Sequence, residues 1–323
     1  MEHRELATEY SSGFVLAPMA GITDSAMRRI CRGLGATATV TEMVSAAGLS
    51  RRSVKTSRLL VHTEEERPLG VQLFGCKPED FFRAAGLLDE LGFDFVDINA
   101  GCPVRRVASK GSGAGLLRDL PRLLRIVEAT RSSTRLPVTV KIRLGWSPDI
   151  PLDPAAPRLL AEAGASAIAV HGRHRCDQFA GDVDCAGIAR IVSSSPVPVL
   201  ANGDSSSSSA VRSLLRSTGA SGALLGRGAV SNPWIFRGLR GGGPARAMPG
   251  ELREIVNLQL RMMHGYIDAP YVYHAMRGHL CRYLRGFPEA SSVRERAVHV
   301  ETDADVDAVL AMAEERIHGG RPE

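Results

Sequence analysis

The sequence predicts an α/β protein in which a (β/α)8 TIM barrel is followed by a small all-helical C-terminal domain. Short apolar runs alternate with helical stretches up to residue 240, and successive runs start far enough apart for one helix and two loops. The runs are almost continuous in apolar residues, which is typical of parallel strands buried on both faces. Beyond residue 250 the apolar residues follow a helical period, and no strand-like run returns.

The length of the chain fits this organisation. It has 323 residues, enough for a barrel of about 250 residues and a small appended domain, and its apolar fraction of 44% is that of a globular protein. We expect residues 1–240 to form the barrel and residues 241–323 the helical domain, joined by the glycine-rich segment 240–244 (RGGGP). In chain order, the predicted strands are Phe14–Ala17, Ala38–Glu42, Leu69–Phe74, Phe95–Asn99, Val138–Arg143, Ala167–His171, Val197–Asn202 and Ala223–Gly226.

Helical stretches lie between these strands, among them Asp80–Leu91, Leu120–Arg131 and Pro154–Ala163. The serine run 205–209 reads as a loop tip that leads into another helix. Residues 250–318 carry the helical period of the second domain.

The net charge of +5 hides an uneven distribution. Residues 237–300 contain ten arginines and five carboxylates, whereas residues 301–323 contain seven carboxylates and two arginines. A basic helical block favours a polyanion partner such as a nucleic acid, although such a block is often only a solvated face. Both interpretations stay open on charge alone.

The cysteines and the N-terminal sequence argue against a zinc protein, a secreted protein and a membrane protein. None of the six cysteines belongs to a C-x-x-C pair, and no His pair stands at zinc spacing, so we expect no metal site. The first residues are charged, with no secretory apolar core, and no apolar run reaches the roughly 18–20 residues of a membrane-spanning helix. We therefore expect a cytoplasmic protein with reduced thiols and no membrane partner. We also expect it to be a monomer.

Polar and glycine residues gather at the carboxyl ends of the predicted strands. In a parallel barrel these ends meet in one mouth, which is where barrel enzymes place their chemistry. We therefore expect one shared site there. Its candidate residues from the strand ends are Pro18, Met19, Ala20, Gln72, Asn99, Lys141, Arg143, His171, Arg173, Asn202, Gly203, Asp204, Gly226 and Arg227.

Cys102 follows the fourth strand on a turn shaped by Gly101 and Pro103. A single cysteine is more often a small core residue than a catalyst, but the polar strand ends around it favour a catalytic thiol. The nearby run 111–115 (GSGAG) imitates a dinucleotide fingerprint. Because it follows no strand, we expect it instead to shape the loop after Cys102.

Lys141 lies inside an apolar run, where a lysine is costly unless an anion meets it. That anion is either a structural carboxylate or an anionic cofactor such as a reduced flavin. Gly203 and Gly226 follow the last two predicted strands, where barrels often bind phosphate through backbone N–H groups. Arg227 would add a charge-assisted contact to that phosphate.

Seven motifs, in this order, make the chain similar to the tRNA-dihydrouridine synthases, a family of flavin enzymes that reduce uridine in tRNA. They are 17–24 (APMAGITD), 65–75 (EERPLGVQLFG), 97–104 (DINAGCPV), 140–146 (VKIRLGW), 170–173 (VHGR), 201–204 (ANGD) and 226–229 (GRGA). A further segment, 276–284 (MRGHLCRYL), resembles the helical tRNA-binding domain of that family more loosely.

The resemblance implies an FMN-containing barrel, NADPH or NADH as the electron donor and tRNA as the partner. It implies that Cys102 donates a proton and that Asn99 lies in the substrate site, and we expect Arg143, Arg173 and Arg277 to contact the substrate as well. Flavin contact is carried onto Pro18, Met19, Ala20, Gln72, Lys141, His171, Asn202, Gly203, Asp204, Gly226 and Arg227. The chain departs from the family pattern at Ala100, His174, near Cys185 and in the serine run 205–209.

The implied reaction transfers a hydride from the flavin to C6 of a uridine that has left its base stack, while Cys102 protonates C5. A thiol suits this role because it is protonated at neutral pH and able to give up its proton. The alternative is a flavin barrel acting on a free pyrimidine, as dihydroorotate dehydrogenases do. The basic helical block favours tRNA, because a small substrate needs no such surface.

Overall fold

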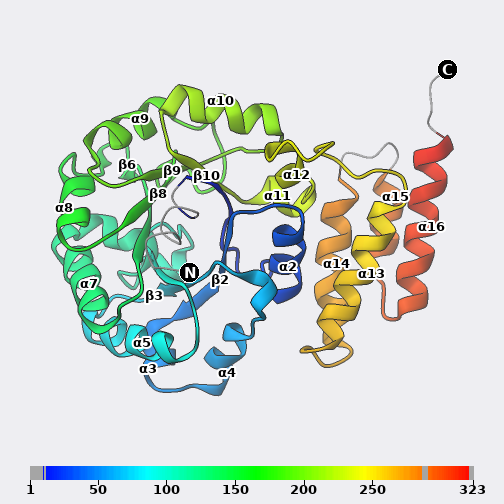
Figure 1. Ribbon diagram of the computed structural model, residues 1–323, viewed down its shortest axis with the longest axis horizontal. Coiled ribbons are helices and arrows are strands. Elements are labelled where there is room, and N and C mark those ends of the chain that lie inside the picture. The colour runs from blue at the N-terminus through cyan, green and yellow to red at the C-terminus, as the bar shows by residue number, and fades with distance from the viewer. Residues whose placement is uncertain (1–9, 11, 286–289, 320–323) are drawn as a thin grey trace.

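The computed structural model describes residues 10, 12–285 and 290–319 and shows a closed barrel beside a group of helices (Figure 1). The barrel strands are all parallel and close in the order β1-β10-β9-β8-β5-β4-β3-β2. Their bounds are Phe14–Leu16 (β1), Ala38–Ser45 (β2), Leu69–Phe74 (β3), Phe95–Asn99 (β4), Val138–Arg143 (β5), Ala167–His171 (β8), Val199–Asn202 (β9) and Gly222–Leu225 (β10). The predicted fold class is confirmed.

The middle strands, β3, β4, β5 and β8, have the predicted bounds, whereas several others differ at their ends. Strand β2 continues to Ser45, three residues beyond the predicted end at Glu42. Strand β9 begins at Val199 rather than Val197, because Pro198 has no N–H to give to the ladder. A small antiparallel hairpin, Gly145–Ser147 (β6) and Ile150–Pro151 (β7), follows β5 and was not predicted.

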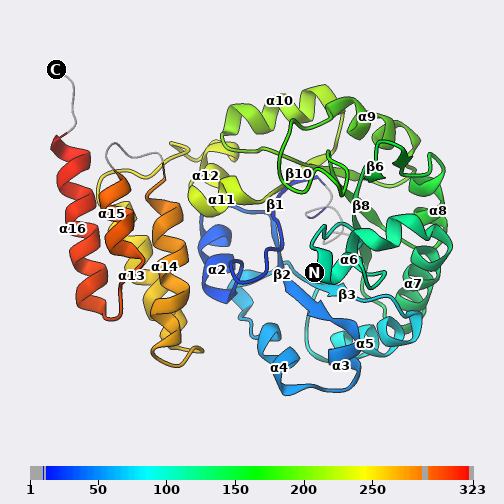
Figure 2. The ribbon, with the colours of Figure 1, turned by 180° about the vertical axis from the view of Figure 1, so that it is seen from behind.

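Helices cover the outside of the barrel, as both ribbon views show (Figures 1 and 2). Two of them begin where the sequence provides a start signal: α5 has Pro78 in its first turn, and Ser207, from the serine run, accepts a hydrogen bond from Ala210 N at the start of α10. The barrel-side α-helices are Ser25–Gly33 (α2), Ala46–Ser50 (α3), Val54–Ser57 (α4), Pro78–Glu90 (α5), Arg105–Ala108 (α6), Leu120–Ser133 (α7), Ala156–Glu162 (α8), Cys185–Ser194 (α9), Ser208–Thr218 (α10), Arg227–Ser231 (α11) and Ile235–Leu239 (α12). Short 3-10 turns lie at Arg58–Leu60 (η1), Glu64–Glu66 (η2) and Gly113–Arg118 (η3).

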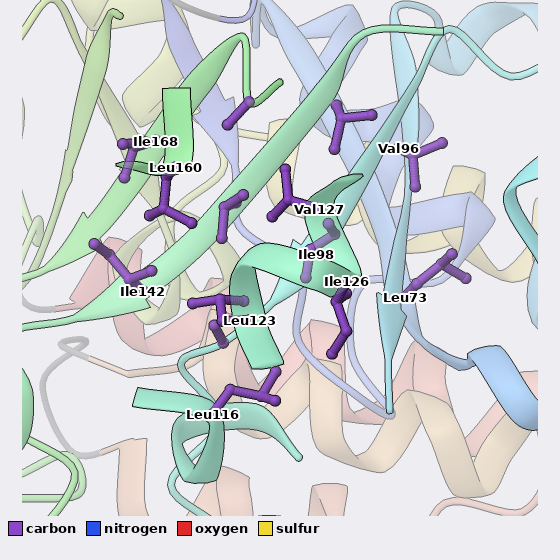
Figure 3. Close-up of a cluster of buried hydrophobic side chains, with 14 of the residues drawn as sticks. Leu73, Val96, Ile98, Leu116, Leu123, Ile126, Val127, Ile142, Leu160 and Ile168 are labelled. Atoms are coloured by element: carbon purple, nitrogen blue, oxygen red, sulfur yellow. The ribbon is translucent and has the colours of Figure 1, made fainter. Parts of the chain in front are cut away.

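Alternation along the strands separates the core from the site. Val96 and Ile98 of β4 point outward and pack with buried residues of α7 such as Ile126 (Figure 3). Because side chains alternate along a strand, Asp97 and Asn99 face the barrel interior. The outward layer is apolar, while the inward layer of the same strand carries polar groups toward the mouth.

The bottom of the barrel is closed by aromatic packing. The Tyr10 ring lies 4.7 Å from the Phe95 ring, centroid to centroid, and both side chains are buried. Small residues such as Ala167 and Ala169 of β8 belong to the same cluster. The interior is therefore filled with side chains at this end of the barrel.

The C-terminal helices are Glu251–His264 (α13), Tyr271–Tyr283 (α14), Ala290–Ala297 (α15) and Asp303–Gly319 (α16). They share a hydrophobic cluster with Ala26 and Ile30 of α2 and with Trp234, so this group of helices packs on the side of the barrel (Figure 2). The hydroxyl of Tyr266 also accepts a hydrogen bond from Ala26 N at 3.0 Å. Within the described residues, no helix combines the length and the apolar character needed to cross a membrane.

Candidate active site

A cavity of about 940 Å³ opens at the carboxyl ends of the barrel strands. It collects all but one of the residues that the sequence assigned to the site. Those lining it are Pro18, Met19, Ala20, Gln72, Asn99, Cys102, Lys141, Arg143, His171, Arg173, Asn202, Gly203, Asp204, Gly226 and Arg227. Its size is that of a pocket for a cofactor with part of a substrate.

The turn that carries Cys102 is held from several sides. The side-chain oxygen of Asn99 accepts hydrogen bonds from Gly101 N at 3.1 Å and from Cys102 N at 2.9 Å. The Gly101 carbonyl accepts from Arg143 Nε at 2.8 Å, and the Cys102 carbonyl accepts from Ala114 N at 3.0 Å. These bonds fix the backbone of a thiol that is only 8% exposed and lies at the cavity wall.

The glycine run 111–115 supports this turn from behind, as the sequence predicted. Gly113 has φ +55°, and a Cβ built there would meet the Cys102 carbonyl oxygen at 2.9 Å and the Cys102 Cβ at 3.0 Å. Only glycine satisfies both the left-handed backbone and the close approach. The run therefore belongs to the cysteine loop and does not form a dinucleotide site.

Lys141 reaches into the cavity from β5. Its Nζ donates to Asn202 Oδ1 at 3.0 Å, and no carboxylate of the described residues lies within ion-pair distance of it. Burial lowers the pKa of Lys141 to about 8, with a further decrease from the Arg143 cation. The lysine is therefore mostly protonated at neutral pH, and no carboxylate of the described residues is in direct contact with it. The alternative that a structural carboxylate pairs with Lys141 is wrong.

His171 ends β8, and its imidazole lies beside the Arg173 guanidinium. Burial, followed by the surrounding cations of which Lys141 is the largest contributor, lowers the pKa of His171 far below its usual value. Arg173 Nη1 lies 3.2 Å from His171 Nε2, and because a guanidinium only donates, that nitrogen is the acceptor. The imidazole is therefore neutral, with its proton on Nδ1, and can donate from that atom.

Arg173 and Asp204 organise the loop after β8. The Arg173 guanidinium donates to the carbonyls of Ala180 and Gly181 and pairs with the Asp204 carboxylate. Asp204 also pairs with Arg227 at 3.3 Å. The structure thus commits Arg173 to protein partners, and Asp204 holds two arginines beside Gly203 and Gly226.

Arg143 is buried and spans two loops. Besides Gly101, its guanidinium donates to the His174 carbonyl at 2.9 Å, and it lies 5.5 Å from the centre of the Phe179 ring. Burial lowers its pKa to about 10, so it stays charged at neutral pH. It lines the cavity as expected, but much of its hydrogen bonding fixes the walls.

Arg277 is the site candidate that the structure does not bring to the cavity. It lies on α14, where its Nε donates to the Val300 carbonyl at 3.0 Å and its Nη2 lies 3.5 Å from Glu301. Those contacts tie α14 to the segment before α16. Charge and helical spacing could not reveal this, because the partner is a distant backbone carbonyl.

Several further cavity residues were not assigned to the site from the sequence, and five of them have large side chains that bear on the site. These five are Phe179, Trp234, Arg246, Tyr283 and Arg285. Phe179 is 51% exposed at the mouth between the guanidinium groups of Arg143 and Arg227. The others come from the junction with the C-terminal helices, and the only signal in the sequence was the general excess of arginine there.

Fold and site together define a (β/α)8 barrel with a cationic pocket at its carboxyl mouth and a helical appendage beside it. Solved structures of morphinone reductase share the fold at a TM-score of 0.50, with 13% identity over 73% of this chain and 87% of theirs. A morphinone reductase mutant in complex with tetrahydroNAD matches equally well, with 11% identity over 73% and 88%. At this identity the likeness concerns the fold alone.

The family model described as Dihydrouridine synthase matches residues 15–318, and the chain belongs to this family. It is 37% identical to tRNA-dihydrouridine synthase B of Pseudomonas aeruginosa over 95% of this chain and 94% of that protein. It is 32% identical to a probable tRNA-dihydrouridine synthase of Aquifex aeolicus over 94% and 96%. The family resemblance read from the sequence is confirmed, and with it the assignment to flavin-dependent oxidoreductases.

Proposed function

We propose that this protein reduces specific uridines in tRNA to 5,6-dihydrouridine, with FMN in the barrel pocket, NADPH as the electron donor and Cys102 as the proton donor. The observation that carries the proposal is the Cys102 turn. A thiol held by hydrogen bonds on both sides of its residue stands at the wall of a pocket that also presents an unpaired lysine. That combination suits delivery of a proton to the uracil ring while a nearby cation stabilises the negative charge that develops during reduction.

The residues of the pocket fit a flavin mononucleotide. Lys141 offers a cation to an anionic ring, and among the described residues the hydrogen-bond partner of its Nζ is Asn202. A Cβ built on Gly226 would find its nearest neighbours at 3.7 Å and 3.8 Å, which leaves backbone accessible from the cavity. Gly203, Gly226 and Arg227 would hold the phosphate, and Gln72 and His171 would contact the ring system. When bound, FMN supplies the hydride for C6 of the uracil ring.

The protein groups then act on the substrate. Lys141 and neutral His171 place a cation and an N–H donor in the pocket, where they would stabilise negative charge on a carbonyl oxygen. Asn99 fixes the Cys102 backbone and lines the same wall. Cys102 would give its proton to C5 of the uracil ring, and solvent would restore the thiol proton.

The C-terminal helices would bind the tRNA. We propose the domain boundary at residue 240, with residues 241–323 as the tRNA-binding domain. Arg246 and Arg285 are exposed, line the cavity and come from the junction between the two parts. Phosphate contacts there would guide a uridine that has left its stack into the mouth. We propose that the enzyme acts on tRNA as a monomer in the cytoplasm.

The proposal is tested with purified protein, NADPH and a tRNA transcript that carries no modifications. The expected result is an FMN absorption spectrum and dihydrouridine in the transcript, detected by mass spectrometry. An excess of free uridine is expected to leave the rate unchanged, whereas a dihydroorotate-type enzyme would consume a free pyrimidine instead. A colourless protein, or a transcript without dihydrouridine, would contradict the proposal.

A further inference from the structure

We infer that Asp97, a residue buried below the pocket, is a positioning residue that sets the orientation of two amide side chains and thereby locks the Cys102 turn. The inference rests on the proposed function, because it explains how the proton donor of that reaction is held. Asp97 does not line the cavity and contacts no reacting atom.

A continuous chain of hydrogen bonds runs from Asp97 to the turn. Asp97 accepts from Thr139 Oγ1 and from Gln72 Nε2, each at 2.6 Å. Gln72 Oε1 accepts from Asn99 Nδ2 at 2.7 Å, and Asn99 Oδ1 accepts from the backbone of Cys102. The side chains of this chain are between 0% and 5% exposed.

The strand register builds the chain. Gln72 of β3 lies opposite Asp97 of β4, and Asp97 lies opposite Thr139 of β5. Asn99 stands two residues beyond Asp97 on the same inward face. Three adjacent strands thus place these groups in contact without any loop.

The polarity of the chain follows from the chemistry of its first member. An ionised carboxylate only accepts hydrogen bonds, so Gln72 must turn its NH2 group toward Asp97 and its oxygen toward Asn99. Asn99 must then offer its NH2 group to Gln72 and its oxygen to the turn. Burial raises the pKa of Asp97 to about 6, so the carboxyl is ionised at neutral pH.

The opposite polarity would release the turn. If the amides were inverted, Asn99 would present its NH2 group to the N–H groups of Gly101 and Cys102, and donors would face donors. Within the amide pair itself the two orientations are equivalent, so the groups at its two ends decide between them: the N–H donors of the turn at one end and an acceptor at the other. Asp97 is that acceptor.

Three variants of similar shape separate this role from simple packing. Asp97→Asn allows both polarities, because the new amide can donate either to Thr139 or to Gln72. Thr139→Val keeps the carboxylate and hence the polarity. In the double variant, the amide introduced by Asp97→Asn has only Gln72 as an acceptor among its present partners, which favours the inverted chain.

Two readouts apply to each holoenzyme: the single-turnover rate of uridine reduction by enzyme whose flavin was reduced beforehand, and the rate at which iodoacetamide alkylates Cys102, followed by peptide mass spectrometry. We expect Thr139→Val to stay within about twofold of wild type in both. Asp97→Asn is expected to slow uridine reduction about tenfold, the double variant more than tenfold, and alkylation should accelerate in the same order.

Asp94→Asn is the matched control, since Asp94 is also a buried carboxylate at β4 but accepts from Arg67 and Leu69 N at the other end of the barrel. It is expected to lower Tm without changing alkylation of Cys102. The inference is wrong if Asp97→Asn and the double variant keep wild-type rates in both readouts, or if Asp97→Asn merely lowers Tm as Asp94→Asn does. Alkylation needs no turnover, so a wild-type enzyme that forms no dihydrouridine would refute the proposed function and still leave the positioning role measurable.

Discussion

The floor and the rim of the cavity are built in opposite ways. The floor, meaning the inward side chains of the strands below the mouth, consists of buried or half-buried groups whose polar atoms are bonded to other strands of the barrel, as Asn99 and Lys141 show. The rim carries exposed cations such as Arg246 and Arg285. A hydrogen-bonded floor suits chemistry that depends on the position of single atoms, whereas exposed cations suit a charged polymer whose phosphates can be bound in several ways.

The largest expected effect is on the floor. Cys102→Ala should leave flavin bound and NADPH oxidation intact, while uridine reduction falls by about 10²–10⁴-fold, because only proton donation is removed. Stopped-flow absorbance separates the two half-reactions. Cys176→Ala is the control, since Cys176 is also a free thiol but is exposed and outside the cavity. If Cys102→Ala slowed NADPH oxidation and uridine reduction equally, the assignment of Cys102 as proton donor would be wrong.

The second largest effect is expected at Gly113, which supports the Cys102 turn from behind. Gly113→Ala puts a Cβ within 3.0 Å of Cys102 at a left-handed φ, so we expect a loss of about 1–3 kcal/mol in stability and at least a tenfold slower uridine reduction. Gly92→Ala is matched, since Gly92 has φ +78° and nothing within 4 Å of a built Cβ. It should lower stability, measured by urea unfolding, without slowing the reaction. Equal kinetics for the two variants would contradict a supporting role for Gly113.

Lys141 shows what the floor costs in stability. Its folded pKa of about 8 lies below the value of 10.5 for an ordinary lysine, so the folded state binds its proton more weakly than the unfolded state. The destabilisation is therefore present below pH 8 and is relieved as the pH rises from 8 toward 10.5. Lys141→Met should raise the Tm of the flavin-free protein at pH 7 and weaken FMN binding several-fold. A lower Tm together with unchanged FMN binding would contradict this assignment.

The rim should give the smallest effect and the steepest salt dependence. Arg246→Gln with Arg285→Gln is expected to raise KM for tRNA several-fold at unchanged kcat and to reduce the slope of log Kd against log salt by about 1–2. Arg261→Gln is a suitable control, because Arg261 is exposed but does not line the cavity. If the Arg246→Gln, Arg285→Gln variant lowered kcat, the rim would take part in the chemistry as the floor does, and the proposed difference between the two regions would be wrong.

The sequence predicted the fold and the position of most of the site because parallel strands bring their carboxyl ends together. Gln72, Asn99 and Lys141 could be grouped on that basis before any coordinates. The partners of Arg173 and Arg277 could not be predicted, since both donate to loop carbonyls whose positions depend on the complete fold.

Two further features could not be read from the sequence for different reasons. Phe179 belongs to no pattern, and its place at the mouth depends on the course of the loop after β8. Asp97 did carry a signal, because it lies two residues before Asn99 and therefore on the same inward face of β4. What the alternation could not show is that a carboxylate two residues away would set the orientation of that asparagine.

The most direct measurement is position-resolved mass spectrometry of tRNA from a strain that lacks this gene. The account predicts that one or more dihydrouridines are replaced by uridine, and that a plasmid with the wild-type gene restores them whereas one with Cys102→Ala does not. A full set of dihydrouridines in the deleted strain, or restoration by Cys102→Ala at the wild-type level, would contradict it.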